Sequence, residues 1–296
     1  MSDQSAARLT IIGDRINPGF KDTRALLEAN DLAALQALAV RQVEAGAAAL
    51  DFTIGPRARD DAGFLGDAIC AVQAAVEVPL CFDYPEIAVQ EACLAVYDPG
   101  RARGGKPIIN SLAETRWAMT RLLDLRPCRV LLMASERLEE GAGRPNRSAS
   151  EIAATARRAA LRLAREHGLA LDDIIVDVSV SALIADTSGL NRATLEAIRA
   201  IGSDPELRGI HICGGLTNIG QLLPARAADG GELKHRLARA FVTLAAPLGF
   251  DTVLGTPWHC FDPLPEDDFV LQAYRRILER SGTDAIREVR RLYRAA

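Results

Sequence analysis

Short apolar runs rich in β-branched residues alternate along the chain with longer amphipathic segments. The apolar runs predict strands at 9–12, 48–54, 79–82, 107–110, 130–133, 174–178, 209–213 and 252–254. The amphipathic segments predict helices at 31–45, 61–75, 86–96, 112–124, 150–167, 191–201, 233–246 and 267–279. We expect a last, C-terminal helix at 283–295. Eight strand–helix units therefore follow one another in a single chain.

Each predicted strand is a nearly continuous apolar run, as in parallel strands that are buried on both faces. Eight units with none left over favour a closed (β/α)8 TIM barrel in a single domain over 1–296. A doubly wound open sheet is the alternative, but the turn at 13–19 reads Gly-Asp-Arg-Ile-Asn-Pro-Gly and lacks the G-x-G-x-x-G spacing typical of that fold. The polar, glycine-rich segment at 134–149 is a candidate mobile lid.

Charge and composition exclude several classes of function. The chain carries 35 Lys and Arg against 39 Asp and Glu, a net charge of −4, which argues against nucleic-acid binding. No apolar run approaches the ~18 residues that a membrane span needs, and residues 1–8 lack the pattern of a secretory signal. The 6 cysteines form no C-x-x-C pair, so no zinc or redox motif is predicted. We expect a cytoplasmic protein without a nucleic-acid or membrane partner.

Polar residues at the strand ends point to the chemistry, because the active site of a TIM barrel lies at the C-terminal ends of its strands. Asp83 and Asp177 lie inside otherwise apolar strands, where a bare carboxylate is costly to bury, and Asn110 ends the fourth strand. Two carboxylates and an amide suit a flat heterocycle rich in N–H groups, such as a pterin or a guanine-like ring. The alternative is that both carboxylates pair with arginines in a structural network.

Two other chemistries fit the strand ends poorly. A Schiff-base aldolase needs a lysine at the C-terminal end of a strand, and of the three lysines only Lys21, in the first loop, remains a weak candidate. His259, Cys260 and Asp262 cluster after the eighth strand, but residues so close in sequence rarely point at one ion. We therefore predict no metal site.

Six short motifs at the predicted strand ends together resemble a known family. They read Ile-Ile-Gly-Asp-Arg-Ile-Asn at 11–17, Ala-Leu-Asp-Phe-Thr-Ile-Gly-Pro at 49–56, Cys-Phe-Asp at 81–83, Ile-Asn-Ser at 109–111, Val-Asp at 176–177 and Gly-Leu-Thr-Asn-Ile-Gly at 215–220. Their order and spacing resemble the pterin-binding methyltransferases, which include the methyltetrahydrofolate–corrinoid protein methyltransferases and the folate domain of cobalamin-dependent methionine synthase. The wider superfamily includes dihydropteroate synthase.

The resemblance implies a dihydropteroate synthase-like barrel that binds the pterin of tetrahydrofolate in its mouth. It implies that Asp83, Asn110 and Asp177 hold the pterin ring. Asn218 matches the asparagine that approaches N5, the atom that carries the methyl group. The same resemblance adds further contacts to the site, at Asn17, Gly55, Ser111 and, more distantly, Arg226.

The rim departs from the family pattern more than the pterin contacts do. Asp14 stands where the family usually has Glu, and Thr53 replaces a common Asn. The segment Trp-His-Cys at 258–260 replaces a small acidic one, and the loop after the fifth strand is longer. These differences bear on the identity of the methyl donor or acceptor more than on the binding of a pterin.

The expected function is methyl transfer between N5 of tetrahydrofolate, as methyltetrahydrofolate, and the cobalt of a corrinoid (cobalamin), in a direction that the sequence does not decide. The chain has no Asp-x-His-x-x-Gly corrinoid-binding motif, so the expected partner is a separate corrinoid protein. The resemblance also implies a homodimer. One alternative is a dihydropteroate synthase-like enzyme, although the lysine such an enzyme needs at the end of the seventh strand is missing. The other is a pterin-binding subunit without transfer activity.

Overall fold

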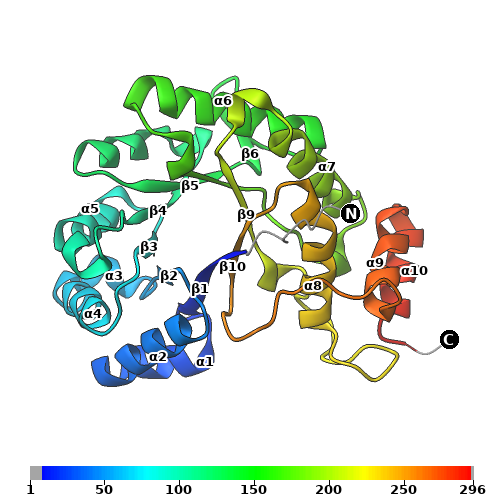
Figure 1. Cartoon of the computed structure of the whole chain (residues 1–296), viewed down its shortest axis with the longest axis horizontal. Coiled ribbons are helices and arrows are strands. Elements are labelled where there is room, and N and C mark those ends of the chain that lie inside the picture. The colour runs from blue at the N-terminus through cyan, green and yellow to red at the C-terminus, as the bar shows by residue number, and fades with distance from the viewer. Residues whose placement is uncertain (1–8, 295–296) are drawn as a thin grey trace, which may run out of the picture.

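The strands close into a barrel. The computed structural model describes residues 9–294 (Figure 1). Its parallel barrel strands are β1 (Thr10–Ile16), β2 (Ala49–Phe52), β3 (Leu80–Asp83), β4 (Ile108–Leu112), β5 (Arg129–Met133), β8 (Ile174–Asp177), β9 (His211–Gly215) and β10 (Thr252–Gly255). They neighbour one another in the ring order β1-β10-β9-β8-β5-β4-β3-β2, and β2 pairs with β1 to close the ring. The predicted (β/α)8 barrel is confirmed.

Helices cover the outside of the ring, close to where the periodicity predicts them (Figure 1). The long ones are α2 (Leu32–Glu44), α4 (Ala62–Ala75), α5 (Ile87–Val96), α6 (Ala149–His167), α7 (Leu190–Gly202), α8 (Lys234–Ala245), α9 (Phe269–Leu278) and α10 (Gly282–Arg291). Residues at the ends of α6 stabilise its termini. Ser148 and Glu151 form a capping box before the helix, and Gly168 ends it at φ 64°. None of the helices in the described chain has the length and apolarity for a bilayer crossing.

Several predicted boundaries were wrong. β1 runs on to Ile16, so Asp14 lies within the strand and not after it. The helix predicted at 112–124 starts later, since Leu112 ends β4, and it is a 3-10 segment (Glu114–Asp124) interrupted at Arg116 by φ −125° and ψ 34°. The last helix ends at Arg291, short of 295, and residue 295 lies outside the described residues. Two short helices were not predicted, α1 (Lys21–Glu28) and α3 (Arg57–Asp60).

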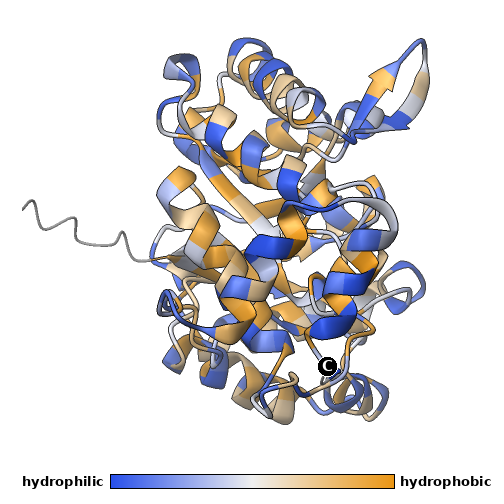
Figure 2. Cartoon of the chain, turned by 90° about the vertical axis from the view of Figure 1, so that its right-hand side faces the viewer, coloured by the Kyte–Doolittle hydropathy of each residue, from blue (hydrophilic) through white to orange (hydrophobic). Residues whose placement is uncertain are grey.

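The segment at 134–149 forms an antiparallel hairpin, β6 (Glu136–Glu139) with β7 (Ala142–Pro145). It projects from the body of the molecule, as the upper right of Figure 2 shows. Buried Asn146 fixes its base, because Nδ2 donates to the carbonyl of Ala134 and to Thr155 Oγ1, each at 2.9 Å. The structure thus assigns a regular ribbon to a segment for which the sequence predicted only a polar loop.

Two apolar cores position the site. The larger lies between the strands and the surrounding helices and includes the edge-to-face pairs of Phe82 with Phe52 and with Tyr97. The smaller fills the inside of the barrel and takes one residue from each strand: Ile12, Ala49, Cys81, Ile108, Leu131, Ile175, Cys213 and Leu254. This inner layer closes the barrel, so anything bound at the mouth rests on an apolar floor.

Candidate active site

The residues two positions beyond the inner layer form the floor of the mouth. Successive side chains of a strand alternate between its faces, so these residues point into the barrel one step nearer its C-terminal end. They are Asp14, Asp51, Asp83, Asn110, Met133, Asp177, Gly215 and Thr256. Four of the eight positions are therefore carboxylates. The predicted group Asp83, Asn110 and Asp177 is brought together here, and Asp83 and Asn110 are direct partners in the β3–β4 register.

Hydrogen bonds orient part of this layer. Asn110 Nδ2 donates to Asp51 Oδ1 at 3.2 Å, and Thr256 Oγ1 donates to Asp14 Oδ1 at 3.0 Å. Behind the layer, the fully buried Gln90 of α5 donates from Nε2 to the carbonyls of Phe82 at 2.7 Å and of Asn110 at 3.0 Å. Gln90 thereby ties the end of β3 to that of β4, which fixes the spacing between Asp83 and Asn110.

Asp83 and Asp177 have no arginine partner within ion-pair distance in the described chain, so the alternative of a structural network does not hold there. Asp177 Oδ1 accepts the backbone N–H of Ser179 at 2.7 Å. The guanidinium of Arg116, the opposing charge that acts on Asp83, instead donates to Ser111 Oγ at 3.0 Å. The two carboxylates therefore keep hydrogen-bonding capacity for a ligand.

Burial raises the pKa values of the carboxylates in this cluster, and their mutual repulsion adds to the shift. Burial raises the pKa of Asp83, and the charge of Arg116 opposes that shift. Burial raises the pKa of Asp177 to about 6, with a smaller opposing effect from the Ser179 N–H. The pKa of Asp51 is raised well above its usual value, first by burial and then by the charge of Asp83. Since the groups interact, they titrate together rather than independently.

Of three further predicted residues, Gly55 and Ser111 lie beside this cluster, and Asn17 follows β1. Gly55, at φ 68°, lines a cavity of about 220 Å³ together with Asp83. A Cβ at Gly55 would approach Pro18 Cγ to 2.9 Å, so a side chain does not fit there. Ser111 is buried beside Asn110 and accepts the Arg116 bond. Asn17 is engaged locally, because its Oδ1 accepts the N–H of Gly19 at 2.8 Å.

Asn218 and Arg226 lie in the segment between β9 and α8, outside the layer. Asn218 is exposed in a short 3-10 turn (Leu216–Asn218), and Gln221 Nε2 donates to its Oδ1 at 2.8 Å. This bond leaves the Asn218 Nδ2 group close to Gly215, which belongs to the layer. Arg226 is exposed and donates to the carbonyl of Gly230 in its own loop at 2.9 Å. The structure gives Arg226 no contact with the carboxylate cluster in the described chain.

The sequence argument missed Asp51 and misplaced Asp14, which it had named. Asp51 is 2% exposed and lies within the apolar run of β2, so it carries the same signal that singled out Asp83 and Asp177. It was missed because the predicted strand was extended to residue 54. Asp14 was expected to follow its strand. Gln90 offered no sequence signal, because a glutamine on a helix is ordinarily exposed.

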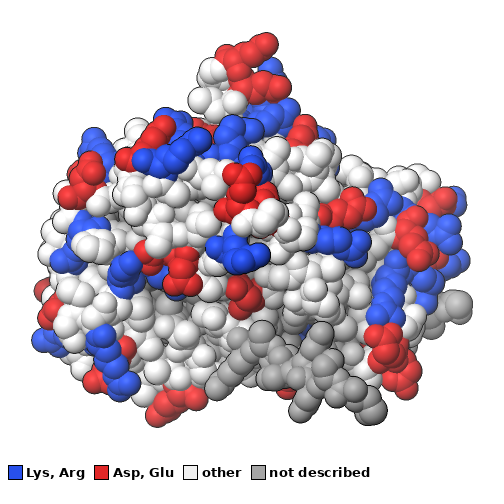
Figure 3. All heavy atoms as spheres, turned by 45° about the horizontal axis from the view of Figure 1, so that its top comes forward, with Lys and Arg blue, Asp and Glu red and all other residues white. Residues whose placement is uncertain are grey.

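The rim is built from stacked cations and rings. Arg15 packs over the ring of Phe20 at 3.7 Å and binds Asp22, while Arg41 packs over Trp258 at 3.9 Å. On the face in Figure 3, positive and negative side chains are interspersed without a patch of one sign. In the described chain, no three His, Cys, Asp or Glu residues are grouped to hold a metal ion.

Comparison with known proteins agrees with this geometry. Residues 21–254 match the family described as pterin binding enzymes. The chain belongs to the pterin-binding enzyme family. Over 255 residues it is 30% identical to a methylcorrinoid:tetrahydrofolate methyltransferase of Eubacterium limosum, an alignment that covers 84% of this chain and 85% of that protein. The resemblance stated from the motifs is confirmed at the level of the family.

Solved structures of dihydropteroate synthases share the fold of this pterin-binding enzyme. The enzyme of Thermus thermophilus superimposes with a TM-score of 0.58 at 18% identity, covering 87% of this chain and 91% of that one. The Xanthomonas albilineans enzyme in complex with 7,8-dihydropteroate gives 0.55 at 20% identity, with 92% and 95% covered. At these sequence identities, the similarity shows a shared barrel fold and carries no conclusion about the reaction.

Proposed function

We propose that this pterin-binding enzyme is a methyltransferase that moves a methyl group between N5 of tetrahydrofolate and the cobalt of a separate corrinoid protein. The observation that carries the proposal is geometric: Asp83, Asn110 and Asp177 lie together on the floor of the mouth, and within residues 9–294 neither carboxylate has an arginine partner. The relative from Eubacterium limosum, named for this pair of substrates, supports it.

The floor suits the pyrimidine edge of a pterin, which presents an amino group and a ring N–H beside a carbonyl. Asp83 and Asp177 accept hydrogen bonds from the N–H groups. Asn110, held by Asp51 at 3.2 Å, offers both a donor and an acceptor. A ligand of this kind recovers the hydrogen bonds that burial denies the carboxylates, so its binding offsets the cost of burying them.

Asn218 is the candidate for the reacting end of the ring. N5 is a poor leaving group unless it gains a proton or a hydrogen bond as its bond to the methyl carbon breaks. The Asn218 amide, oriented by Gln221, can donate that bond and stabilise the transition state more than the ground state. A corrinoid, when bound by the partner protein, supplies the cobalt that gives or takes the methyl group.

Dihydropteroate synthase chemistry has less support in this chain. It calls for a lysine at the end of the seventh barrel strand, which here is β9 and ends in Gly214 and Gly215. A Cβ at Gly214 would come within 2.7 Å of Val180 Cγ2, and one at Gly215 within 3.2 Å of Asn218 Nδ2. Neither position has room for a lysine without rearrangement.

The corrinoid protein is proposed as a separate partner because the chain carries no corrinoid-binding motif. It would approach the C-terminal ends of the strands, where the floor residues lie. We further propose that the protein is a homodimer and acts in the cytoplasm.

The test is calorimetric titration of methyltetrahydrofolate into the protein and into Asp83→Asn, with the exposed Asp67→Asn on α4 as the control. We expect binding by the native protein, a loss of affinity of about 10- to 100-fold in Asp83→Asn, and no change in the control. Transfer to free cob(I)alamin, and from methylcobalamin to tetrahydrofolate, is followed by the absorbance of the corrinoid. A folded protein that binds folate but transfers in neither direction would be a binding subunit; one that binds no folate would refute the proposal.

A further inference from the structure

A half-buried arginine, Arg116, stands at the edge of the floor without a carboxylate partner. It follows β4, at the residue where φ −125° and ψ 34° interrupt the 3-10 segment. Its Nη2 donates to Ser111 Oγ at 3.0 Å and to Met133 Sδ at 3.7 Å, and Met133 belongs to the floor. In residues 9–294 no Asp or Glu lies within ion-pair distance of this guanidinium. Its charge is therefore not neutralised by direct contact.

The charge of Arg116 acts on Asp83. Asp83 and Asn110 are partners in the β3–β4 register, and Ser111, which binds Arg116, is the next residue of β4. Burial raises the pKa of Asp83, and the positive charge of Arg116 lowers it. The two side chains thus interact through space but are too far apart to form an ion pair.

The groups that face Asp83 from the neighbouring strands do not favour its ionised form. Asp51 on β2 and Asp177 on β8 are carboxylates, and their pKa values are raised in part by the charge of Asp83. Cys81 and Tyr84 are neutral, because burial raises the pKa of the thiol and of the hydroxyl. An ionised Asp83 therefore needs a positive charge from another element.

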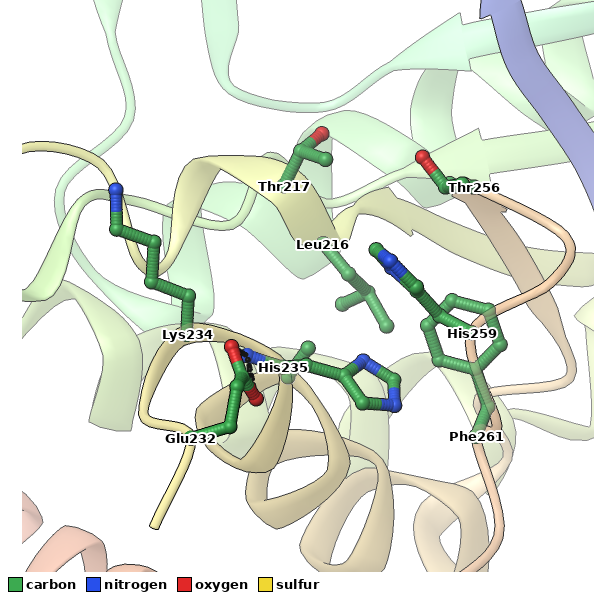
Figure 4. Close-up of a pocket in the computed structure, with 10 residues that line it drawn as sticks. Leu216, Thr217, Glu232, Lys234, His235, Thr256, His259 and Phe261 are labelled. Carbon is green, nitrogen blue, oxygen red and sulfur yellow. Dashed lines mark hydrogen bonds between the residues drawn. The ribbon is translucent and has the colours of Figure 1, made fainter. Parts of the chain in front are cut away.

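Neither the cation beside β3 nor those across the ring supply this charge. Arg59 lines the cavity of about 220 Å³ at the end of β3, but it is paired with Glu86 at 3.4 Å. Lys234, His235 and His259 line a second cavity, at the ends of β9 and β10 (Figure 4). In the ring, β9 lies across from β3 and β10 lies across from β4, so these three groups are remote from the β3–β4 edge of the floor.

We infer that Arg116 is a positioning residue of the site, which favours the ionised form of Asp83 so that this carboxylate accepts the N–H groups of a pterin; the inference rests on the proposed function. The bonds to Ser111 and Met133 hold the guanidinium at the edge of the floor. An arginine in direct contact would take the hydrogen bonds that the ligand needs. Without the charge, Asp83 would more readily be neutral, and its O–H would face the N–H donors of the ring.

The experiment compares Arg116→Gln and Arg116→Lys with the native protein. Glutamine removes the charge but keeps a donor for Ser111, whereas lysine keeps the charge. Arg121→Gln is the control, because Arg121 belongs to the same segment but is exposed and paired with Glu91 at 2.8 Å. Methyltetrahydrofolate is titrated calorimetrically into each protein at two pH values. The ionisation of Asp83 in the ligand-free protein is followed by NMR of the aspartate carboxyl carbons, with Asp83→Asn to assign its signal.

We expect Arg116→Gln to weaken binding about three- to tenfold at about pH 5.5 but less than about twofold at about pH 8. The reason is that loss of the positive charge raises the pKa of Asp83, so the neutral form is more populated at the lower pH. The ratio of two affinities at one pH cancels the protonation of the ligand itself. Arg116→Lys should restore most of the affinity at the lower pH, and Arg121→Gln should match the native protein. The NMR signal of Asp83 should titrate at higher pH in Arg116→Gln.

A loss of equal size at both pH values would overturn the inference, because a direct contact with the ligand or a purely structural role does not depend on the ionisation of Asp83. An unchanged NMR titration of Asp83 would also overturn it. In the Asp83→Asn background, Arg116→Gln should have no pH-dependent effect on affinity, and such an effect would assign the charge to another group. These outcomes leave the proposed function intact, whereas a native protein that binds no folate would refute it.

Discussion

At the scale of single residues, the site is defined by carboxylates that burial holds away from their usual ionisation. Asp177 and Asp83 lie half-buried on the barrel floor, and Asp51 is almost fully buried beside them. A protein that served stability alone would replace such groups with apolar ones, since each buried charge costs free energy. The free energy lost by burying these carboxylates is consistent with a role in ligand binding, because active sites commonly sacrifice stability for function.

Asp177→Asn should therefore stabilise the fold at neutral pH. The folded pKa of Asp177 is raised from 3.8 to about 6, so the native state holds its proton longer than the unfolded state does. Stability then falls as pH rises from about 4 to about 6, and the loss is at most about 3 kcal/mol at 1.36 kcal/mol per pKa unit. We expect the variant to gain about 1–3 kcal/mol in the free energy of unfolding at pH 8, little at pH 4, and to bind folate weakly.

Denaturant unfolding at both pH values measures this gain, with Asp67→Asn as the control. A gain that is the same at pH 4 and pH 8 would contradict the assignment to Asp177.

At the scale of elements, the β6–β7 hairpin is the part of the barrel that projects from its body (Figure 2). It follows β5 at the C-terminal ends of the strands and carries Leu138, an apolar side chain that is 50% exposed. Its base is held by Asn146, and further along the ribbon the backbone N–H of Leu138 donates to Glu114 Oε2 at 3.0 Å. We therefore expect the hairpin to contact a partner protein that approaches the mouth from this side.

Shortening the hairpin should affect only transfer that involves the partner protein. Arg137 and Arg144 face each other in the register, so replacing 138–143 by Asn-Gly leaves a two-residue turn between paired positions. We expect native folate affinity and native transfer with free cobalamin, but a rate with the protein-bound corrinoid that is lower by about tenfold.

The control for the hairpin is Leu125→Ser, because Leu125 is also exposed, at 56%, but lies before β5 at the other end of the barrel. Equal loss with free and protein-bound corrinoid would show that the hairpin acts on the site itself and not on docking.

At the scale of the whole molecule, charged side chains are paired at the N-terminal end of the barrel but not at its C-terminal floor. The C-terminal end leaves Asp83 and Asp177 without arginine partners in the described chain. At the N-terminal end, Lys106 binds Asp173 at 2.6 Å, and His211 lies 2.7 Å from Asp251 through Nδ1. Charges at the N-terminal end of a TIM barrel are ordinarily structural, and paired groups there keep the strand ends together.

His211→Gln should therefore lower stability in a pH-dependent way. The hydrogen bond with Asp251 raises the pKa of His211 above its usual value, against the effect of burial. The stabilisation is fully present below the unfolded value of about 6.5 and is lost as pH rises through the folded pKa. We expect the variant to cost about 1 kcal/mol at pH 5.5 and less at pH 9, measured by denaturant unfolding. With His167→Gln as the control, a cost independent of pH would exclude the ion pair as its source.

The sequence by itself determined the barrel and much of its floor. Eight apolar runs separated by amphipathic segments have few other ways to bury their strands on both faces. Asp83, Asn110 and Asp177 stood out because a polar residue in such a run must face a partner or a ligand. Asp51 carried the same signal, so it too was within reach of the sequence.

Only the tertiary structure decided which residues meet. Closure of the ring brings Thr256 to Asp14 across 242 positions of the chain, and it sets β9 and β10 opposite β3 and β4. The hydrogen bonds by which Gln90 of α5 joins the ends of β3 and β4 depend on how helices pack against strands, which local periodicity does not encode. Polarity along a strand shows that a residue is costly to bury, whereas its partner is fixed by contacts between segments that are distant in the sequence.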